Sequence, residues 1–256
     1  MINRILEFEN QNYFWLKIAR RIARLKNVYF VPSSKNILPK KNYPLDNVEN
    51  FFKEQLSNFE KKIKFNKNLY KILSIYFKKN SKINLLDYGG ENLDLYMYLI
   101  KNFPKIKINV LNQPKLSNEL KKIIKNEKIN NIKVFSNINQ IKSKKFNFIF
   151  FGSTIQYLRN HEDVLDKLSK NTSRFLYIAA TSYFYEKNLR KKILVKQVNL
   201  LPVILYCYIY NFHYFTQMMV KKKFKILFKR KNEFKKISFN NFEFKIDHLN
   251  ILFKRN

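Results

Sequence analysis

The chain is poor in glycine, in acidic residues and in cysteine. Its 256 residues include three glycines, 18 acidic residues and one cysteine, Cys207. A single cysteine excludes a disulfide framework and any zinc site that needs several cysteines. Because this usage fits a reducing compartment, we expect a cytoplasmic protein.

The sequence also lacks a long uninterrupted hydrophobic run. The longest apolar-rich stretch, residues 200–215, is interrupted by Pro202, Asn211 and His213. It is shorter than the roughly 20 residues that span a bilayer. Residues 1–12 mix charged and apolar side chains and lack the apolar centre of a signal peptide. We therefore expect a protein that is soluble or bound to the membrane periphery.

Positive charge is what the sequence has in excess. Lys and Arg number 51, which gives a formal net charge of +33. Such a charge can indicate nucleic acid or an anionic membrane as a partner. The lysines, however, are scattered over nearly every segment, and the richness in Lys, Asn, Ile, Phe and Tyr is typical of an AT-rich genome. We favour compositional drift as the cause, so nucleic acid is not an expected partner, although the charge leaves it open.

From Lys82 onward, short apolar runs alternate with helical patterns. The expected strands are 83–87, 106–111, 132–135, 146–151 and 174–179. The expected helices between them are 93–102, 116–126 and 161–169. This alternation is typical of βαβ units and predicts an α/β fold with a doubly wound, mostly parallel, Rossmann-like sheet. Right-handed crossovers would put the first and fourth strands side by side.

The N-terminal part is expected to be a helical extension, residues 1–64, that covers an α/β domain of residues 65–256. Residues 12–26 form an amphipathic pattern with a basic face, followed by expected helices at 46–61 and 66–79. A basic amphipathic helix can lie on an anionic membrane or pack on its own domain. Both interpretations stay open, and the first predicts a peripheral contact with the inner face of the membrane.

The C-terminal part is less regular. Residues 183–222 are rich in aromatic side chains and are expected to be helical. Three short strands are expected at 224–228, 242–246 and 249–253, with a terminal antiparallel hairpin on the edge of the sheet.

The three glycines follow two of the expected strands. Gly89 and Gly90 come after the first strand, and Gly152 comes after the fourth. Glycine is used where the backbone needs a positive φ or comes close to a ligand. Since ligands of open α/β sheets bind outside the carboxyl ends of the strands where the strand order reverses, the glycines predict one pocket.

These segments resemble a known family. Ile83-Asn-Leu-Leu-Asp-Tyr-Gly-Gly resembles the first motif of class I S-adenosylmethionine-dependent methyltransferases. Together with Gly152-Ser-Thr-Ile-Gln-Tyr-Leu and Val195-x-Gln197, it is similar to a family of methyltransferases usually found among polysaccharide and O-antigen biosynthesis genes. The similarity covers about residues 48–230. It implies a seven-stranded sheet, S-adenosylmethionine as cofactor, and methyl transfer to an oxygen or nitrogen of a small-molecule or cell-envelope saccharide acceptor.

The expected site has two groups of residues. The candidates for cofactor binding are Asp87, Gly89, Gly90, Asn112, Gly152 and Ser153. Asp87 could anchor the glycine loop or accept from the cofactor's ammonium group, and Asn112 stands where an acid normally binds the ribose hydroxyls. The candidates for catalysis are Gln156, Tyr157 and His161, where His161 is either a general base or a residue that flanks its helix. No cluster has metal-ligand spacing, so no metal is expected.

The chain departs from the family pattern at three places. A glycine of the pattern is Leu93, the ribose-binding acid is Asn112, and an Asp-Arg-Thr element is Ala179-Ala180-Thr181. A neutral amide binds a hydroxyl group less strongly than a carboxylate does. These departures leave open an alternative function, a non-catalytic methyltransferase-like binding protein with a degenerate cofactor site.

Overall fold

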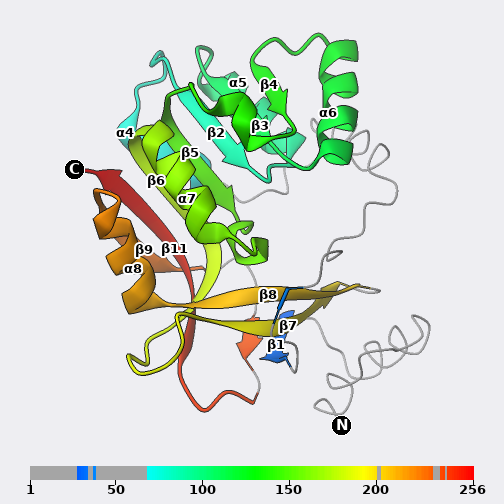
Figure 1. Ribbon diagram of the computed structural model, residues 1–256. Coiled ribbons are helices and arrows are strands. Elements are labelled where there is room, and N and C mark those ends of the chain that lie inside the picture. Colours follow the sequence, from blue (N-terminus) through cyan, green and yellow to red (C-terminus); the bar gives the residue numbers. More distant parts are fainter. Residues whose placement is uncertain (1–27, 34–36, 39–67, 201–202, 233–236, 240) are drawn as a thin grey trace.

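A computed structural model describes residues 28–33, 37–38, 68–200, 203–232, 237–239 and 241–256 (Figure 1). The helices expected at 12–26 and 46–61 lie outside the described residues. So does the expected domain boundary between residues 64 and 65.

The centre of the molecule is a parallel sheet, as predicted. Its strands are β2 (Asn84–Tyr88), β3 (Lys107–Leu111), β4 (Ile132–Phe135), β5 (Phe146–Gly152) and β6 (Thr172–Phe184). They lie in the order β4-β3-β2-β5-β6, and every neighbouring pair is parallel. The strand order reverses between β2 and β5, which confirms that the two glycine-bearing strands are neighbours.

Helices cover both faces of this sheet (Figure 1). The structure has α4 (Asn68–Tyr76), α5 (Leu93–Asn102), α6 (Pro114–Asn126), η1 (Ile138–Ile141), η2 (Ile155–Tyr157), α7 (His161–Asn171) and α8 (Phe212–Lys221). Buried side chains of α4, α5 and α6 belong to one apolar core, and those of α7 and α8 belong to a second. Local sequence explains two of the helix starts. The Asn92 side chain caps α5 by accepting from the Leu95 amide. Pro114 is the first residue of α6, where its missing N–H leaves no hydrogen bond unmade.

The carboxy-terminal strands close one edge of the sheet. Strand β11 (Ile246–Arg255) pairs antiparallel with β6 and with β9 (Phe224–Lys231). The terminal segment is thus antiparallel, as expected, but 249–253 pairs with β6 and β9 and not in a hairpin with 242–246. A strand expected at 242–246 is absent from the described structure; β10 (Ile237–Phe239) lies earlier instead.

The helical interpretation of residues 183–222 is wrong for most of that stretch. Strand β6 continues to Phe184, β7 (Lys192–Leu200) and β8 (Val203–Asn211) form a hairpin, and α8 alone is helical. On β8, Tyr208 and Tyr210 face one core while Cys207 and Ile209 face another. Because both faces are apolar, the strand lacks the polar–apolar alternation that identifies a half-buried strand.

The hairpin extends the sheet well beyond the seven strands expected. Strand β8 pairs with the end of β6, β7 pairs with β1 (Val28–Pro32), and β1 pairs with β10, so the described sheet has 11 strands. We call β8, β7, β1 and β10 the distal sheet. Figure 1 shows it below the central sheet, joined to it through the long strand β6.

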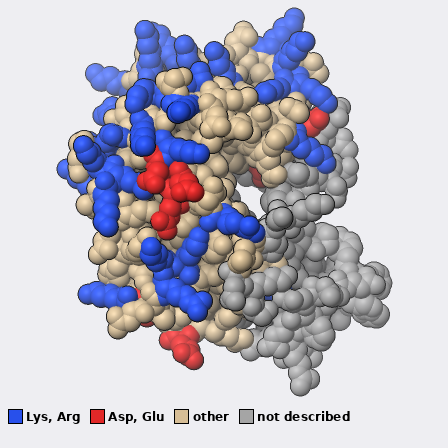
Figure 2. All heavy atoms as spheres, in the orientation of Figure 1, with Lys and Arg blue, Asp and Glu red and all other residues tan. Residues whose placement is uncertain are grey.

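Basic side chains occur in many places on the visible face of the molecule. Figure 2 shows groups of Lys and Arg scattered among residues of other types, with a smaller group of Asp and Glu between them. Within the described part of the chain, no helix is long and apolar enough to cross a membrane.

Candidate functional site

Three loops meet at the point where the strand order reverses. Gly89, directly after β2, has a φ of 74°, and its amide donates to the Leu111 carbonyl of β3 at 2.7 Å. A Cβ atom on Gly89 would lie 2.3 Å from Cγ2 of Thr154, which follows β5. The loops after β2, β3 and β5 are therefore in contact, and only glycine fits between them.

Asp87, at the end of β2, packs against Gly90 of the glycine loop. Its side chain is 3% exposed, and its Oδ2 accepts a hydrogen bond of 2.8 Å from the Tyr96 hydroxyl of α5. A Cβ atom on Gly90 would lie 2.0 Å from the Tyr96 oxygen and 2.5 Å from the Asp87 carboxyl carbon. Gly90 thus gives room to the Asp87–Tyr96 pair. The cofactor contact expected for it stays a prediction.

The Asp87 carboxyl has an unusual proton affinity. Burial raises its pKa from 3.8 to about 7, although the hydrogen bond from Tyr96 lowers it and the charge of Glu91 raises it further. At neutral pH the carboxyl is therefore protonated in a large fraction of the molecules. This favours the role of a loop anchor over that of a fixed negative charge.

Asn112 joins two of the loops. Its Nδ2 donates to the Gly90 carbonyl at 2.9 Å, and its Oδ1 accepts from the Gln113 amide at 2.8 Å. The residue thus lies where the sequence predicts it, beside the glycine loop. Both ends of its amide already have partners within the chain.

Polar residues also follow β5. Ser153 has a φ of 63°, its hydroxyl donates to the Ala180 carbonyl, and it accepts from Nε2 of the buried Gln156, both at 3.3 Å. Gly152 is exposed, and a Cβ atom there would lie 2.9 Å from the Phe150 ring. Ser153 and Gln156 thus fix the turn that leads from β5 into η2.

Tyr157 links this turn to the distal sheet. Its hydroxyl donates to Oε1 of Gln197 on β7 at 2.9 Å. The same oxygen accepts a weaker hydrogen bond of 3.4 Å from the Cys207 thiol of β8. The Val195-x-Gln197 element of the sequence therefore connects η2 to the distal sheet.

His161 is the first residue of α7 and packs against Tyr210 of β8. It is 3% exposed, its ring centroid is 4.6 Å from that of Tyr210, and its Nδ1 is 3.4 Å from the Lys192 ammonium. Burial and the charges of Lys192 and Lys222 lower its pKa to about 3. The ring is neutral at physiological pH and is a weak base.

Two residues of the site could not be identified from the sequence. Tyr96 binds Asp87 from nine positions further along the chain, and Thr154 packs on Gly89. A tyrosine on the apolar face of a helix looks like an ordinary core residue, so nothing in the pattern singles out Tyr96. Thr154 lies within the quoted Gly152-to-Leu158 segment, next to residues that were identified.

No group of three His, Cys, Asp or Glu residues that could hold a metal ion occurs in the described parts of the chain.

Comparison with solved structures identifies the fold. A Galdieria sulphuraria protein described as a sarcosine dimethylglycine methyltransferase matches 82% of this chain and 98% of its own, with a TM-score of 0.55 and 11% identity. An S-adenosylmethionine-dependent methyltransferase from Clostridium acetobutylicum matches 82% of this chain and 100% of its own, with a TM-score of 0.52 and 11% identity. Magnesium protoporphyrin IX methyltransferase from Synechocystis PCC 6803 with bound SAH matches 82% of this chain and 97% of its own, with a TM-score of 0.50 and 11% identity.

The sequence itself matches no family model and no curated protein. The structural matches, together with the order of the central strands, β11 and β9, show that the chain has the fold of class I S-adenosylmethionine-dependent methyltransferases.

Proposed function

We propose that the protein transfers a methyl group from S-adenosylmethionine to an oxygen or nitrogen atom of a small-molecule acceptor. The meeting of the loops after β2, β3 and β5 around Gly89 carries this proposal, because it lies at the switch point of this fold. The Synechocystis protein, which is similar in structure, holds SAH, the demethylated product (S-adenosylhomocysteine). That ligand supports S-adenosylmethionine as the cofactor.

The groups at these loops fit such a ligand. The Asn112 amide both donates and accepts, Ser153 offers a hydroxyl group, and the backbone at Gly89 has no side chain to keep a ligand at a distance. Asn112 would bind the ribose hydroxyls, and the loop at Gly89 would lie along the methionine part. When bound, S-adenosylmethionine supplies an electrophilic methyl group on its sulfonium centre.

The contribution of the chain is then mainly alignment of the acceptor. Asp87 and Tyr96 act as positioning residues, since their hydrogen-bonded pair packs against Gly90 of the glycine loop. Tyr157 positions η2 through its hydrogen bond to Gln197. His161 is a poor candidate for removal of the acceptor's proton, because its Nδ1 faces the Lys192 ammonium.

The acceptor class and the cellular place are further parts of the proposal. A saccharide or other precursor of the cell envelope is suggested by the sequence resemblance alone. A cytoplasmic protein at the inner face of the membrane would meet such an acceptor, and residues 12–26 would provide the contact with anionic lipid.

The cofactor proposal is tested by isothermal titration calorimetry and thermal shift with S-adenosylhomocysteine. A saturable heat with one site per chain, and a rise in melting temperature, are expected for the full-length protein. If millimolar S-adenosylhomocysteine gives neither signal, the methyltransferase proposal loses its basis.

A second candidate, a binding protein without catalysis, is favoured by one observation. One donor and one acceptor site of the Asn112 amide are already used by Gly90 and Gln113, which leaves fewer for a ribose. Asn112→Asp restores a charged acceptor, and we expect about tenfold tighter binding of S-adenosylhomocysteine if the site is only weakened. No gain would favour the non-catalytic alternative, and Gln113→Glu, at the exposed next position, shows whether any acid nearby acts in the same way.

A further inference from the structure

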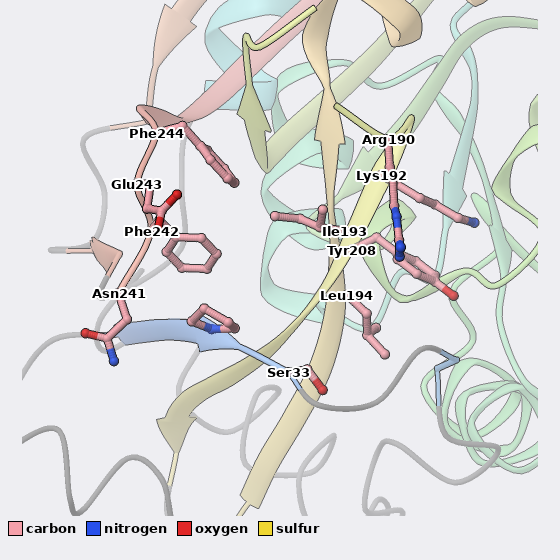
Figure 3. A pocket seen from close by; sticks show the side chains of 11 residues that line it. Ser33, Arg190, Lys192, Ile193, Leu194, Tyr208, Asn241, Phe242, Glu243 and Phe244 are labelled. Atoms are coloured by element: carbon pink, nitrogen blue, oxygen red, sulfur yellow. The ribbon is translucent and has the colours of Figure 1, made fainter. Parts of the chain in front are cut away.

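A pocket lies at the edge of β7, away from the three loops. Strand β1 pairs with β7 only as far as Pro32, which lies opposite Val195. Beyond that point, residues 192–194 of β7 continue without β1, and the chain around Phe242 faces them across a pocket of about 400 Å³ (Figure 3). Pockets that bind small organic molecules have roughly 300–1,000 Å³, so this one is large enough for a ligand.

About half of the residues that line the pocket are apolar. They are Pro32, Ile193, Leu194, Tyr208, Phe242 and Phe244. Phe242 and Phe244 share one apolar core with Ile193 and suit a flat ligand group, because aromatic faces stack on one another. The walls therefore favour a flat apolar body.

Two cations line one side of the pocket. Arg190 is exposed, and the Lys192 ammonium lies 4.1 Å from the ring centroid of Tyr208. The same ammonium also donates to the Arg159 carbonyl at 3.1 Å and lies 3.4 Å from His161 Nδ1, and the charge of Glu162 acts on it as well. Among the described residues, neither Arg190 nor Lys192 is in an ion pair.

The opposite side carries an acidic side chain, Glu243. Figure 3 shows Glu243 across the pocket from Arg190 and Lys192, next to Phe242. The lining thus has two positive charges at one side and one negative charge at the other. A ligand with a single anionic group would place it at Arg190 and Lys192, whereas a second anionic group would meet Glu243.

We propose that this pocket binds an organic anion, a carboxylate or a phosphate ester, with a flat apolar body. Arg190 and Lys192 bind the anionic group, and the aromatic rings hold the body. This binding stands independently of methyl transfer.

The pocket also has a connection to η2. Tyr157 packs in the same small apolar core as Ile193, Phe242 and Phe244, and η2 directly follows β5. None of the residues that line the pocket belongs to the loops after β2, β3 or β5, so the organic anion is a second ligand and not the methyl acceptor.

The test uses three probes with the same aromatic body: 1-naphthoate, 1-naphthyl phosphate and the neutral 1-naphthamide. Calorimetry on the full-length protein at low salt should give one site per chain for at least one anion, and roughly tenfold weaker binding of the amide. The carboxylate and phosphate arms identify which anionic group the pocket prefers. Equal affinity for the anions and the amide would overturn the proposal, as would no binding of either anion at millimolar concentration.

Exposed residues on the two sides give variants that should fold normally. Arg190→Met should weaken binding of the preferred anion roughly tenfold and remove most of its advantage over the amide. Glu243→Gln should strengthen anion binding about threefold, because it removes a repelling charge. Lys191→Met is the matched control, since Lys191 lies over the Tyr214 ring and does not line the pocket. If Lys191→Met and Arg190→Met have the same effect, general surface charge explains the binding.

A parallel titration with S-adenosylhomocysteine separates the two proposals. Binding of the naphthyl anion without binding of S-adenosylhomocysteine supports the pocket and removes the basis of the methyl-transfer proposal. Binding of S-adenosylhomocysteine alone overturns the pocket and leaves the proposed methyl transfer in place.

Discussion

The two ends of strand β6 lie in different chemical surroundings. Its first part pairs with β5 in the central sheet, where polar side chains and a buried carboxyl hold the loops together. Its last two residues pair with β8 in the distal sheet, where aromatic and aliphatic side chains form the core. The central region contains a buried carboxyl group, that of Asp87, whereas in the distal region Arg190 and Lys192 line the pocket.

This difference has a consequence for proton binding. In the central region, Asp87 changes its charge within the physiological range, because burial raises its pKa to about 7. In the distal core, burial raises the pKa of the Cys207 thiol far above that range, so the thiol stays neutral. The stability of the two regions should therefore respond differently to pH.

The largest effect is expected from Asp87 between pH 4 and pH 8. An unfolded chain ionises this carboxyl near pH 3.8 and the folded protein near pH 7, so the folded state binds more protons in between. Stability is then lost as the pH rises through this window. About three pH units at 1.36 kcal/mol each amount to about 4 kcal/mol. Urea unfolding at pH 4, 6 and 8 should show this loss in the wild type and not in Asp87→Asn.

Comparison of the two proteins isolates Asp87, because the other titrating groups are common to both. Tyr96→Phe provides a second check: without the hydrogen bond that lowers the pKa of Asp87, the loss of stability should move to higher pH. Parallel stability curves for wild type and Asp87→Asn would mean that the carboxyl does not titrate as a buried acid.

The next largest effect is expected from Gly90→Ala, which acts on the central region alone. The new Cβ atom would lie 2.0 Å from the Tyr96 oxygen, so the Asp87–Tyr96 pair would have to move. Overpacking of this kind costs about 3 kcal/mol at its upper range, measurable by urea unfolding. Gly152→Ala is the control, since its Cβ atom would lie 2.9 Å from the Phe150 ring, a milder clash, and we expect about 1 kcal/mol. Equal losses for the two variants would contradict a special role of Gly90.

The central region is also the part that sequence patterns could predict. Its strands are short apolar runs separated by helices with a clear apolar face. The hydrophobic period and the length of each segment therefore indicate the same type of element. Glycines at 89 and 152 marked the switch point because the chain has so few. The Asp87–Tyr96 pair was beyond prediction, since it depends on where the first turns of α5 bring a tyrosine relative to the strand end.

The distal sheet could not be predicted for a physical reason. Strand β8 buries Tyr208 and Tyr210 on one face and Cys207 and Ile209 on the other, so its sequence reads as one continuous apolar run. Periodicity alone cannot separate such a strand from a buried helix. The partners of β7 include β1, which lies more than 150 positions earlier in the chain. The pocket that forms where β1 ends depends on this pairing.

The smallest effect is expected at the link between the two regions, from Tyr157→Phe. The change removes the hydrogen bond from Tyr157 to Gln197 Oε1 and leaves that oxygen with the weaker thiol donor of Cys207. Loss of one such bond costs about 1 kcal/mol, and this cost should fall on opening of the distal sheet.

Cys207 makes that local opening measurable. It is the one cysteine of the chain and is 1% exposed, so a thiol reagent such as DTNB reaches it only when the distal sheet opens. A loss of about 1 kcal/mol raises the open fraction, and with it the labelling rate in native buffer, roughly fivefold. Tyr96→Phe, which weakens the central region instead, should leave the rate within about twofold of the wild type if the distal sheet opens by itself. If Tyr96→Phe accelerates labelling as much as Tyr157→Phe does, the two regions open as one unit. They would then differ in their side chains and not in their local stability.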